Sequence, residues 1–244
     1  LFLETRIMQR FEGKVALVTG AGGNLGRAVA QALADEGASL ALVDLQEQAL
    51  HTTEAGLGVN VDTLSVPTNL IQPESVSDMT PRVLARFKRI DILANIAGGF
   101  AMGPPLHETE DKDWDFMMDL NARSVFNCSR AIIPHMLEQG GGRIVSVSAR
   151  AAAEGKARMA PYCASKAAVI TLTQSLAAEH KFNNITANCI LPGTIDTPQN
   201  RDAMPDADYS NWVPPAALAD VVLFLASDAA RCVSGAAVPV YGRS

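Results

Sequence analysis

Tyr162 and Lys166 are the residues whose types and spacing most directly indicate chemistry. They lie in a run of small and apolar residues that predicts a helix. Residues four apart share one helix face, so the Tyr162 phenol and the Lys166 ammonium are expected to point the same way. A nearby positive charge favours phenolate, which makes Tyr162 a candidate acid or base near neutral pH. The alternative is two ordinary residues on a half-exposed helix, and the rest of the chain must decide.

The elements that must position this pair alternate between short apolar runs and segments with helical spacing. Continuously apolar strands separated by helices predict an α/β fold, with a parallel sheet covered on both faces. In such sheets ligands bind beyond the carboxyl ends of the strands. The expected strands are 14–19, 38–43, 59–66, 90–95, 143–148, 185–191 and 236–241. The expected helices are 24–36, 46–55, 73–89, 113–138 with a break at Pro134, 160–181 and 215–227.

Length and composition exclude several classes of protein. A chain of 244 residues, 48% of them hydrophobic, suits one well-buried domain, expected over 11–244 after an N-terminal extension of 1–10. The net charge of -6 and the lack of a Lys/Arg cluster exclude a nucleic-acid partner. No apolar run approaches a membrane span. Four widely spaced cysteines without a CxxC pair indicate a reducing compartment, which predicts a cytoplasmic protein with no metal site.

A glycine-rich turn, TGAGGNLG at 19–26, joins the first strand to the first helix. Glycines let backbone approach a pyrophosphate, and the positive end of the helix favours its charge. Asp44 ends the second strand, where a carboxylate can accept hydrogen bonds from an adenosine ribose, although it can also merely cap the following helix. Since Asp44 would repel a 2′-phosphate and no Lys or Arg follows it, NAD is favoured over NADP.

These motifs, with others in the same order, resemble the short-chain dehydrogenase/reductase family from Phe11 to Gly242. The further motifs are Asn95-Ile96-Ala97-Gly98, Asp119-Leu120-Asn121 and Pro192-Gly193-Thr194-Ile195-Asp196-Thr197. The resemblance implies a Rossmann-type doubly wound sheet of seven parallel strands. It also implies a small-molecule substrate and hydride exchange between NAD(H) and a hydroxyl or carbonyl carbon, the activity of oxidoreductases that act on CH–OH groups with NAD(P).

The resemblance implies a role for each matching residue. Tyr162 would be the proton donor or acceptor, Lys166 would lower its pKa and hold the nicotinamide ribose, and Asn121 would bend its helix and position a water. Asn121 can equally be a helix residue with local hydrogen bonds. The implied cofactor-binding residues are Gly20, Gly22, Gly23, Asn24, Leu25, Gly26, Asp44, Asn69, Asn95, Ala97, Gly98, Tyr162, Lys166, Pro192, Gly193, Ile195 and Thr197.

Three departures from the family pattern concern the cofactor. Asn24 stands where a glycine is usual, but Gly23 restores an alternative spacing and Asn tolerates left-handed geometry. Asn69 replaces a frequent Asp, keeping an acceptor without its charge. Asn95-Ile96 replaces a usual Asn-Asn pair. We expect cofactor binding to survive these changes.

The fourth departure concerns catalysis. The family's serine usually lies thirteen positions before the tyrosine, and that position is Ala149. Ser148 is its neighbour, but adjacent residues of an extended segment point to opposite sides. Either a bulge turns the Ser148 hydroxyl toward the substrate, which makes it a catalytic residue, or the substrate carbonyl receives no hydrogen bond from a serine hydroxyl. Loss of a needed oxyanion donor costs about 2.7 to 4 kcal/mol.

Two alternatives and two further expectations follow. Ala149-Arg150-Ala151-Ala152 and the segment 196–212 resemble quinonoid dihydropteridine reductases, which would imply reduction of a quinonoid ring. A catalytically inactive NAD-binding sensor or scaffold is the other alternative. The polar stretch 198–214 is expected to close over the substrate, with Arg201 as its one cation. The family resemblance implies a homodimer or homotetramer packed through the helices at 113–138 and 160–181.

Overall fold

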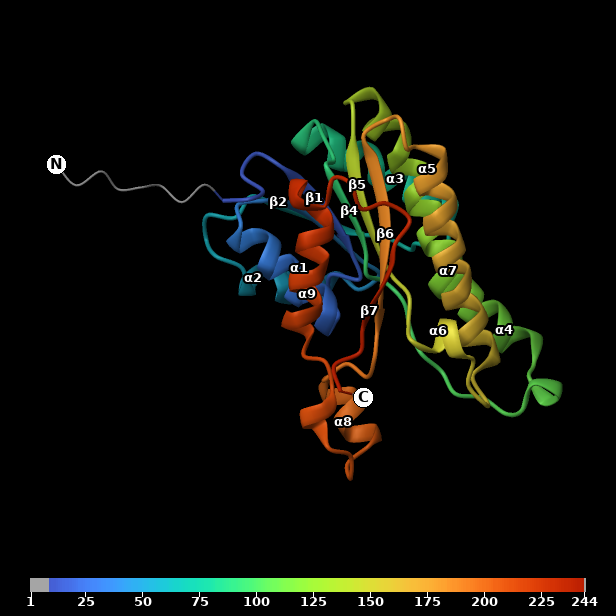
Figure 1. Ribbon diagram of the computed structural model, residues 1–244. Coiled ribbons are helices and arrows are strands. Elements are labelled where there is room, and N and C mark those ends of the chain that lie inside the picture. The colour runs from blue at the N-terminus through green and yellow to red at the C-terminus, as the bar shows by residue number, and fades with distance from the viewer. Residues whose placement is uncertain (1–8, 244) are drawn as a thin grey trace.

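The computed structural model describes residues 9–243 and contains one seven-stranded sheet, in which all paired strands are parallel (Figure 1). The strand order is β3-β2-β1-β4-β5-β6-β7. The strands are β1 (Val15–Thr19), β2 (Ser39–Asp44), β3 (Thr63–Pro67), β4 (Ile92–Asn95), β5 (Gly142–Val147), β6 (Ile185–Pro192) and β7 (Ala237–Val240). This arrangement confirms the predicted doubly wound fold.

Helices cover both faces of the sheet. One layer holds α1 (Asn24–Asp35), α2 (Glu47–Gly56) and α9 (Pro215–Ala226), and the other holds α3 (Pro73–Phe87), α5 (Ser124–Glu138) and α7 (Ala160–Glu179). Each layer buries its own apolar cluster, with Leu33 and Val222 in the first and Met79 and Ile132 in the second. Short helices α4 (Asp111–Met118), α6 (Ala151–Glu154) and α8 (Pro198–Ala203) lie at the lower end of the molecule in Figure 1.

Most expected elements are present, but the long helix at 113–138 breaks at a different place. It divides at a π-helical turn, Asp119–Arg123, and not at Pro134, which lies inside α5. The turn is centred on Asn121, whose buried amide bonds to another segment of the chain. The structure also shows α6 and α8, which the sequence pattern did not predict. Both are too short to display helical periodicity.

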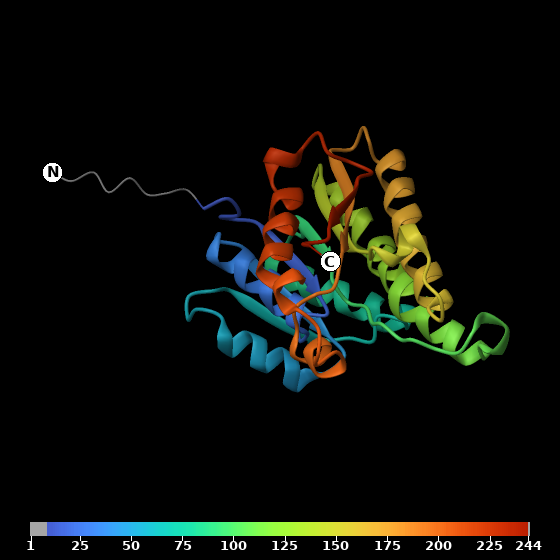
Figure 2. The same ribbon diagram turned by 60° about the horizontal axis from the view of Figure 1, so that its bottom comes forward.

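The strand order reverses between β1 and β4, and in sheets of this kind ligands bind at such a reversal, beyond the carboxyl ends of the strands. Thr19, at the end of β1, holds the segment that follows β4: its Oγ1 accepts hydrogen bonds from the backbone N–H groups of Ile96 and Ala97, at 3.1 and 3.2 Å. Figure 2 turns this lower edge of the sheet toward the viewer. Across residues 9–243, no helix combines the length and apolarity that a membrane crossing requires.

Candidate active site

Tyr162 and Lys166 lie on the first two turns of α7, as their spacing predicts. Lys166 is 4% exposed, and its Nζ donates to the main-chain oxygen of Val147 at the end of β5, at 2.9 Å. Tyr162 is half-buried, and within residues 9–243 its hydroxyl makes no hydrogen bond. The lysine is therefore anchored in the structure, while the phenol is available to a substrate.

Burial dominates the acid–base properties of this pair. Loss of hydration raises the pKa of Tyr162 to about 12 and lowers the pKa of Lys166 to about 8. The expected lowering of the phenol pKa by the ammonium is thus outweighed in the protein without its cofactor. At neutral pH Tyr162 is a neutral phenol, the form that donates a proton to a carbonyl oxygen.

Asn121 is fully buried and joins three parts of the site. Its Nδ2 donates to the Gly99 oxygen at 3.1 Å and to Ser165 Oγ at 3.0 Å, and its Oδ1 accepts from the Gly99 N–H at 2.9 Å. The π-helical turn aims this amide at the segment after β4 and at α7. A Cβ built on Gly98 would lie 2.8 Å from Asn121 Oδ1 and 2.9 Å from Lys166 Nζ, so both polar atoms converge on this glycine.

The Ser148 hydroxyl is turned toward the backbone of α7. Its side chain is 2% exposed, and its hydroxyl donates to the main-chain oxygen of Lys166 at 2.7 Å. Ala149 occupies the position usual for the serine and is 6% exposed. The hydrogen bond therefore favours the second expectation, a substrate carbonyl without this serine donor.

The turn between β1 and α1 has the geometry of a phosphate cradle. Gly20 has φ +64, and a Cβ on Gly26 would lie 2.0 Å from the Gly20 oxygen, so a side chain at either position would displace backbone. Gly23 begins α1 without a side-chain cap, and the first turn has no acidic residue. At the start of α1, the N–H groups of residues 24–26 have no intrahelical partner and are available to an anion, whereas those of residues 21–23 already donate to protein oxygens.

Asp44 lies against this turn, although it is distant in sequence. Its Oδ2 accepts from the Gly22 N–H at 3.0 Å and its Oδ1 accepts from the Gln46 N–H at 3.1 Å. Nearby, Asn24 Nδ2 donates to Gln199 Oε1 of α8 at 2.7 Å, which ties the turn to the segment 198–214. The carboxylate is therefore held beside the cradle by backbone donors.

The remaining cofactor candidates lie along the same carboxyl edge of the sheet. Asn95 pairs in register with Thr19, and its buried Oδ1 has no hydrogen-bond partner among the described residues. Pro192 ends β6, and Thr197 caps α8 by accepting from the Asn200 N–H at 3.2 Å. Three other candidates follow strands that end at this edge. Leu25 lies in α1, Gly193 follows β6, and Ile195 forms a β-bridge with Val213.

Asn69 and Arg201 make local contacts. Asn69 Oδ1 accepts from the Ile71 N–H at 3.3 Å within its own loop. Arg201 forms a two-pronged ion pair with Asp196, at 2.6 and 2.7 Å, and its guanidinium lies 4.8 Å from the Tyr209 ring centre. Its charge is balanced by Asp196, two residues before the stretch 198–214.

Phe100 is a site residue that sequence reasoning missed. Its ring meets the Tyr162 ring edge-on, with centroids 5.0 Å apart and an interplanar angle of 89°. The aromatic directly after Gly98-Gly99 is the signal that could have indicated it, because that segment leaves the carboxyl end of β4.

A bound dinucleotide fits the glycine turn at 19–26, which leads into an uncapped helix, and the unpartnered Asn95 oxygen. Tyr162 and Lys166 lie at the same edge of the sheet, placed for proton transfer. These are the features of a nucleotide-dependent dehydrogenase. The chain belongs to the short-chain dehydrogenase family, whose model matches residues 14–208. This confirms the resemblance seen in the sequence motifs.

Curated relatives match over nearly their full length. The chain is 33% identical over 244 residues to 3-oxoacyl-[acyl-carrier-protein] reductase FabG of Thermotoga maritima, covering 96% of this chain and 98% of that protein. It is 35% identical over 250 residues to dehydrogenase/reductase SDR family member 6 of Rattus norvegicus, with the same coverage of 96% and 98%.

Solved structures agree in fold. Levodione reductase superposes with a TM-score of 0.90 at 30% identity, covering 96% of this chain and 98% of that one. An NAD⁺-bound xylitol dehydrogenase superposes with a TM-score of 0.89 at 30% identity, covering 96% and 99%. The match to complete enzyme chains extends the family assignment from the motifs to the whole sheet.

Proposed function

We propose that the protein is an NAD(H)-dependent oxidoreductase that interconverts a small carbonyl compound and its alcohol. The observation that carries this proposal is the unpaired Tyr162 hydroxyl beside the anchored Lys166, at the same sheet edge as the cradle after β1. Membership in the family and its NAD-bound relative support an oxidoreductase that uses this cofactor class.

Each side chain has a proposed part in carbonyl reduction. The bound dinucleotide supplies the hydride that reaches the carbonyl carbon. Tyr162 donates its phenolic proton to the carbonyl oxygen, so that hydride and proton together give the alcohol. Lys166 stabilises the phenolate that remains. Asn121 holds the segment at Gly99 and, as the family resemblance implies, a water for the return of the proton.

We assign the cofactor to the segments that follow the carboxyl ends of β1, β2, β4 and β6. The turn at 19–26 would hold the pyrophosphate, Asp44 the adenosine ribose, and Asn95 would find a partner for its orphaned oxygen. Because the carboxylate of Asp44 repels a 2′-phosphate, the proposal favours NADH over NADPH. The dissociation constants of NADH and NADPH, measured for wild type and Asp44→Ala, check this assignment. Asp44→Ala should reduce the ratio by which NADH binds more tightly than NADPH.

Tyr162→Phe tests the proposed chemistry. The variant keeps the ring and its contact with Phe100 but loses the proton, so kcat should fall by about 10² to 10⁴. NADH binding, followed by fluorescence, should persist. Full turnover in Tyr162→Phe would contradict the mechanism, and NADH binding without turnover across a broad carbonyl and alcohol panel would favour the sensor or scaffold alternative.

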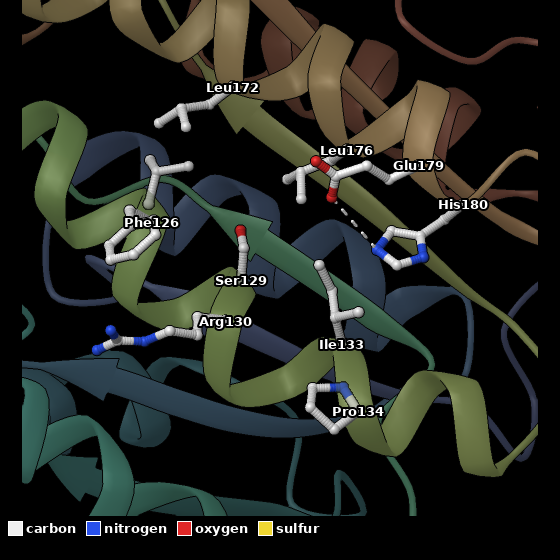
Figure 3. Close-up of a pocket in the computed structure, with 10 residues that line it drawn as sticks. Phe126, Ser129, Arg130, Ile133, Pro134, Leu172, Leu176, Glu179 and His180 are labelled. Carbon is white, nitrogen blue, oxygen red and sulfur yellow. Dashed lines mark ion pairs between the residues drawn. The ribbon is translucent and has the colours of Figure 1, made fainter.

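We also propose that two or four copies assemble through α5 and α7. These helices border a groove of about 280 Å³ whose walls include Ile133, Leu172 and Leu176 (Figure 3). Ser129 Oγ at this groove is buried and finds no hydrogen-bond partner within residues 9–243, and Phe126 is 43% exposed. Light scattering should give a mass of two or four chains, and Leu172→Glu should lower it.

The free thiols at all four cysteines support a reducing, cytoplasmic setting.

A further inference from the structure

Phe100 is an exposed aromatic in direct contact with the proposed proton donor. The side chain is 57% exposed, yet its ring meets Tyr162 edge-on at 5.0 Å. Edge-to-face pairs are a favoured aromatic geometry, so the contact orients both rings. One side of Phe100 therefore touches the phenol, while more than half of its surface remains exposed.

The segment that carries Phe100 is held at both ends. Gly99 is clamped by Asn121 through its N–H and its oxygen. Gly103 makes two hydrogen bonds with Arg158 directly before α7: its N–H donates to the Arg158 oxygen at 2.9 Å, and Arg158 Nε donates to its oxygen at 3.0 Å. Between these anchors the chain presents Phe100 and Met102, the latter 60% exposed.

The segment itself is uncharged, and the cation that contacts it, Arg158, donates its Nε to the Gly103 main-chain oxygen at 3.0 Å. Residues 97–103 contain no ionisable side chain. Arg150 pairs with Glu154 at 2.8 Å, and Arg201 pairs with Asp196. A substrate carboxylate or phosphate beside Phe100 would find no cationic side chain within residues 97–103, so its loss of hydration there would be costly. A flat apolar group would instead bury surface against the two exposed side chains.

We infer that Phe100 and Met102 form an apolar substrate wall, which selects an uncharged carbonyl compound with a flat apolar ring next to the reacting carbon. This inference rests on the proposed function, because it takes Tyr162 as the proton donor. It names the substrate class for that site and makes Phe100 its specificity-determining residue.

The test uses three vicinal dicarbonyls, chosen because Ala149 offers no hydroxyl to polarise an unactivated ketone. They are 1-phenyl-1,2-propanedione with a ring, 2,3-pentanedione without one, and phenylglyoxylate with a ring and a carboxylate. NADH oxidation is measured for wild type, Phe100→Ala, Phe100→Leu and the matched control Phe116→Ala. Phe116 lies on α4 and is 58% exposed, almost the same as Phe100.

Wild type should prefer the phenyl dione over both other compounds. Phe100→Ala should lower the ratio of kcat/KM for the phenyl dione to that for pentanedione about fivefold, mainly through KM. Phe100→Leu should lower this ratio less, and Phe116→Ala should leave it unchanged. If Phe100→Ala left this ratio of kcat/KM values unchanged, for example because kcat fell equally for both diones, Phe100 would only position Tyr162. That result would contradict the proposed apolar wall.

Preference for phenylglyoxylate, or turnover of none of the three compounds by wild type, would also overturn the substrate class. Failure of the proposed function has a different signature. It would appear as no Tyr162-dependent turnover of any carbonyl or alcohol, whereas failure of the wall alone leaves Tyr162-dependent turnover intact.

Discussion

The Ser148 hydroxyl donates to the main-chain oxygen of Lys166 at 2.7 Å, while the Lys166 side chain donates to the main-chain oxygen of Val147 at 2.9 Å. These two hydrogen bonds run in opposite directions between the end of β5 and α7. They set the position of the lysine relative to the sheet, and all of their polar atoms lie in a buried region. Ser148 thus contacts the backbone of α7, the helix that carries Lys166, and helps to hold this helix against the end of β5.

Ser148→Ala should reduce stability more than catalysis. The substitution removes one buried hydrogen bond to the Lys166 oxygen, which keeps its place in the helical ladder of α7, and this costs about 0.5 to 1.5 kcal/mol of unfolding free energy. Chemical denaturation measures this loss, and kcat of the folded variant should stay within about threefold of wild type. A fall in kcat of the size expected for a lost oxyanion donor, about 10² or more, would establish Ser148 as a catalytic residue after all.

Gly98→Ala should damage catalysis while Gly103→Ala should not. The new Cβ at position 98 would lie 2.8 Å from Asn121 Oδ1 and 2.9 Å from Lys166 Nζ, whereas a Cβ at 103 meets nothing within 4 Å. Because both displaced atoms belong to the proposed machinery, kcat should fall about tenfold or more. Steady-state kinetics on the two variants checks this, and equal activities would count against a shared site at Gly98.

Gly26→Ala should weaken cofactor binding. Its Cβ would lie 2.0 Å from the Gly20 oxygen, so the turn at 19–26 must shift. The dissociation constant for NADH should rise at least about tenfold, with a stability loss of about 1 to 3 kcal/mol. Gly56→Ala is the control, because no atom lies within 4 Å of its added Cβ. Unaltered NADH affinity in a folded Gly26→Ala protein would remove the turn from the cofactor site.

Lys166 should make stability rise with pH above neutrality. Burial lowers its pKa from 10.5 to about 8, so between these values the unfolded chain binds more protons than the folded one. The penalty for burying the ammonium is complete below pH 8 and disappears as pH rises through 10.5. Lys166→Met lacks this titration but shares the other ionisable groups.

Urea denaturation of both proteins at pH 7 and pH 9.5 measures the effect. Wild type should gain about 2 kcal/mol relative to Lys166→Met over this interval. A constant difference between the two proteins would mean that the folded-state pKa of Lys166 is close to its ordinary value. The comparison is made without cofactor, the state to which the lowered pKa applies.

Local patterns predicted the elements well where they were long and periodic. The helix carrying Tyr162 and the strand ending in Thr19 lie where their spacing and apolar runs indicate. The break that the local pattern predicted at Pro134 was wrong, although a proline inside a periodic segment is the strongest local breaker signal; the bend implied by the family resemblance, at Asn121, is where the π-helical turn lies. The observed break at Asn121 depends on the hydrogen bonds with Gly99 and Ser165, which are distant in sequence and leave no periodic trace.

The sequence by itself determined the parallel α/β fold, the glycine-rich turn and the shared face of Tyr162 and Lys166, because each follows from residue type and short-range spacing. The tertiary structure decided which way Ser148 points and that Phe100 lies against Tyr162. It also decided that burial, and not the neighbouring charge, governs both pKa values. These properties depend on desolvation and on contacts between segments that only the packed sheet brings together.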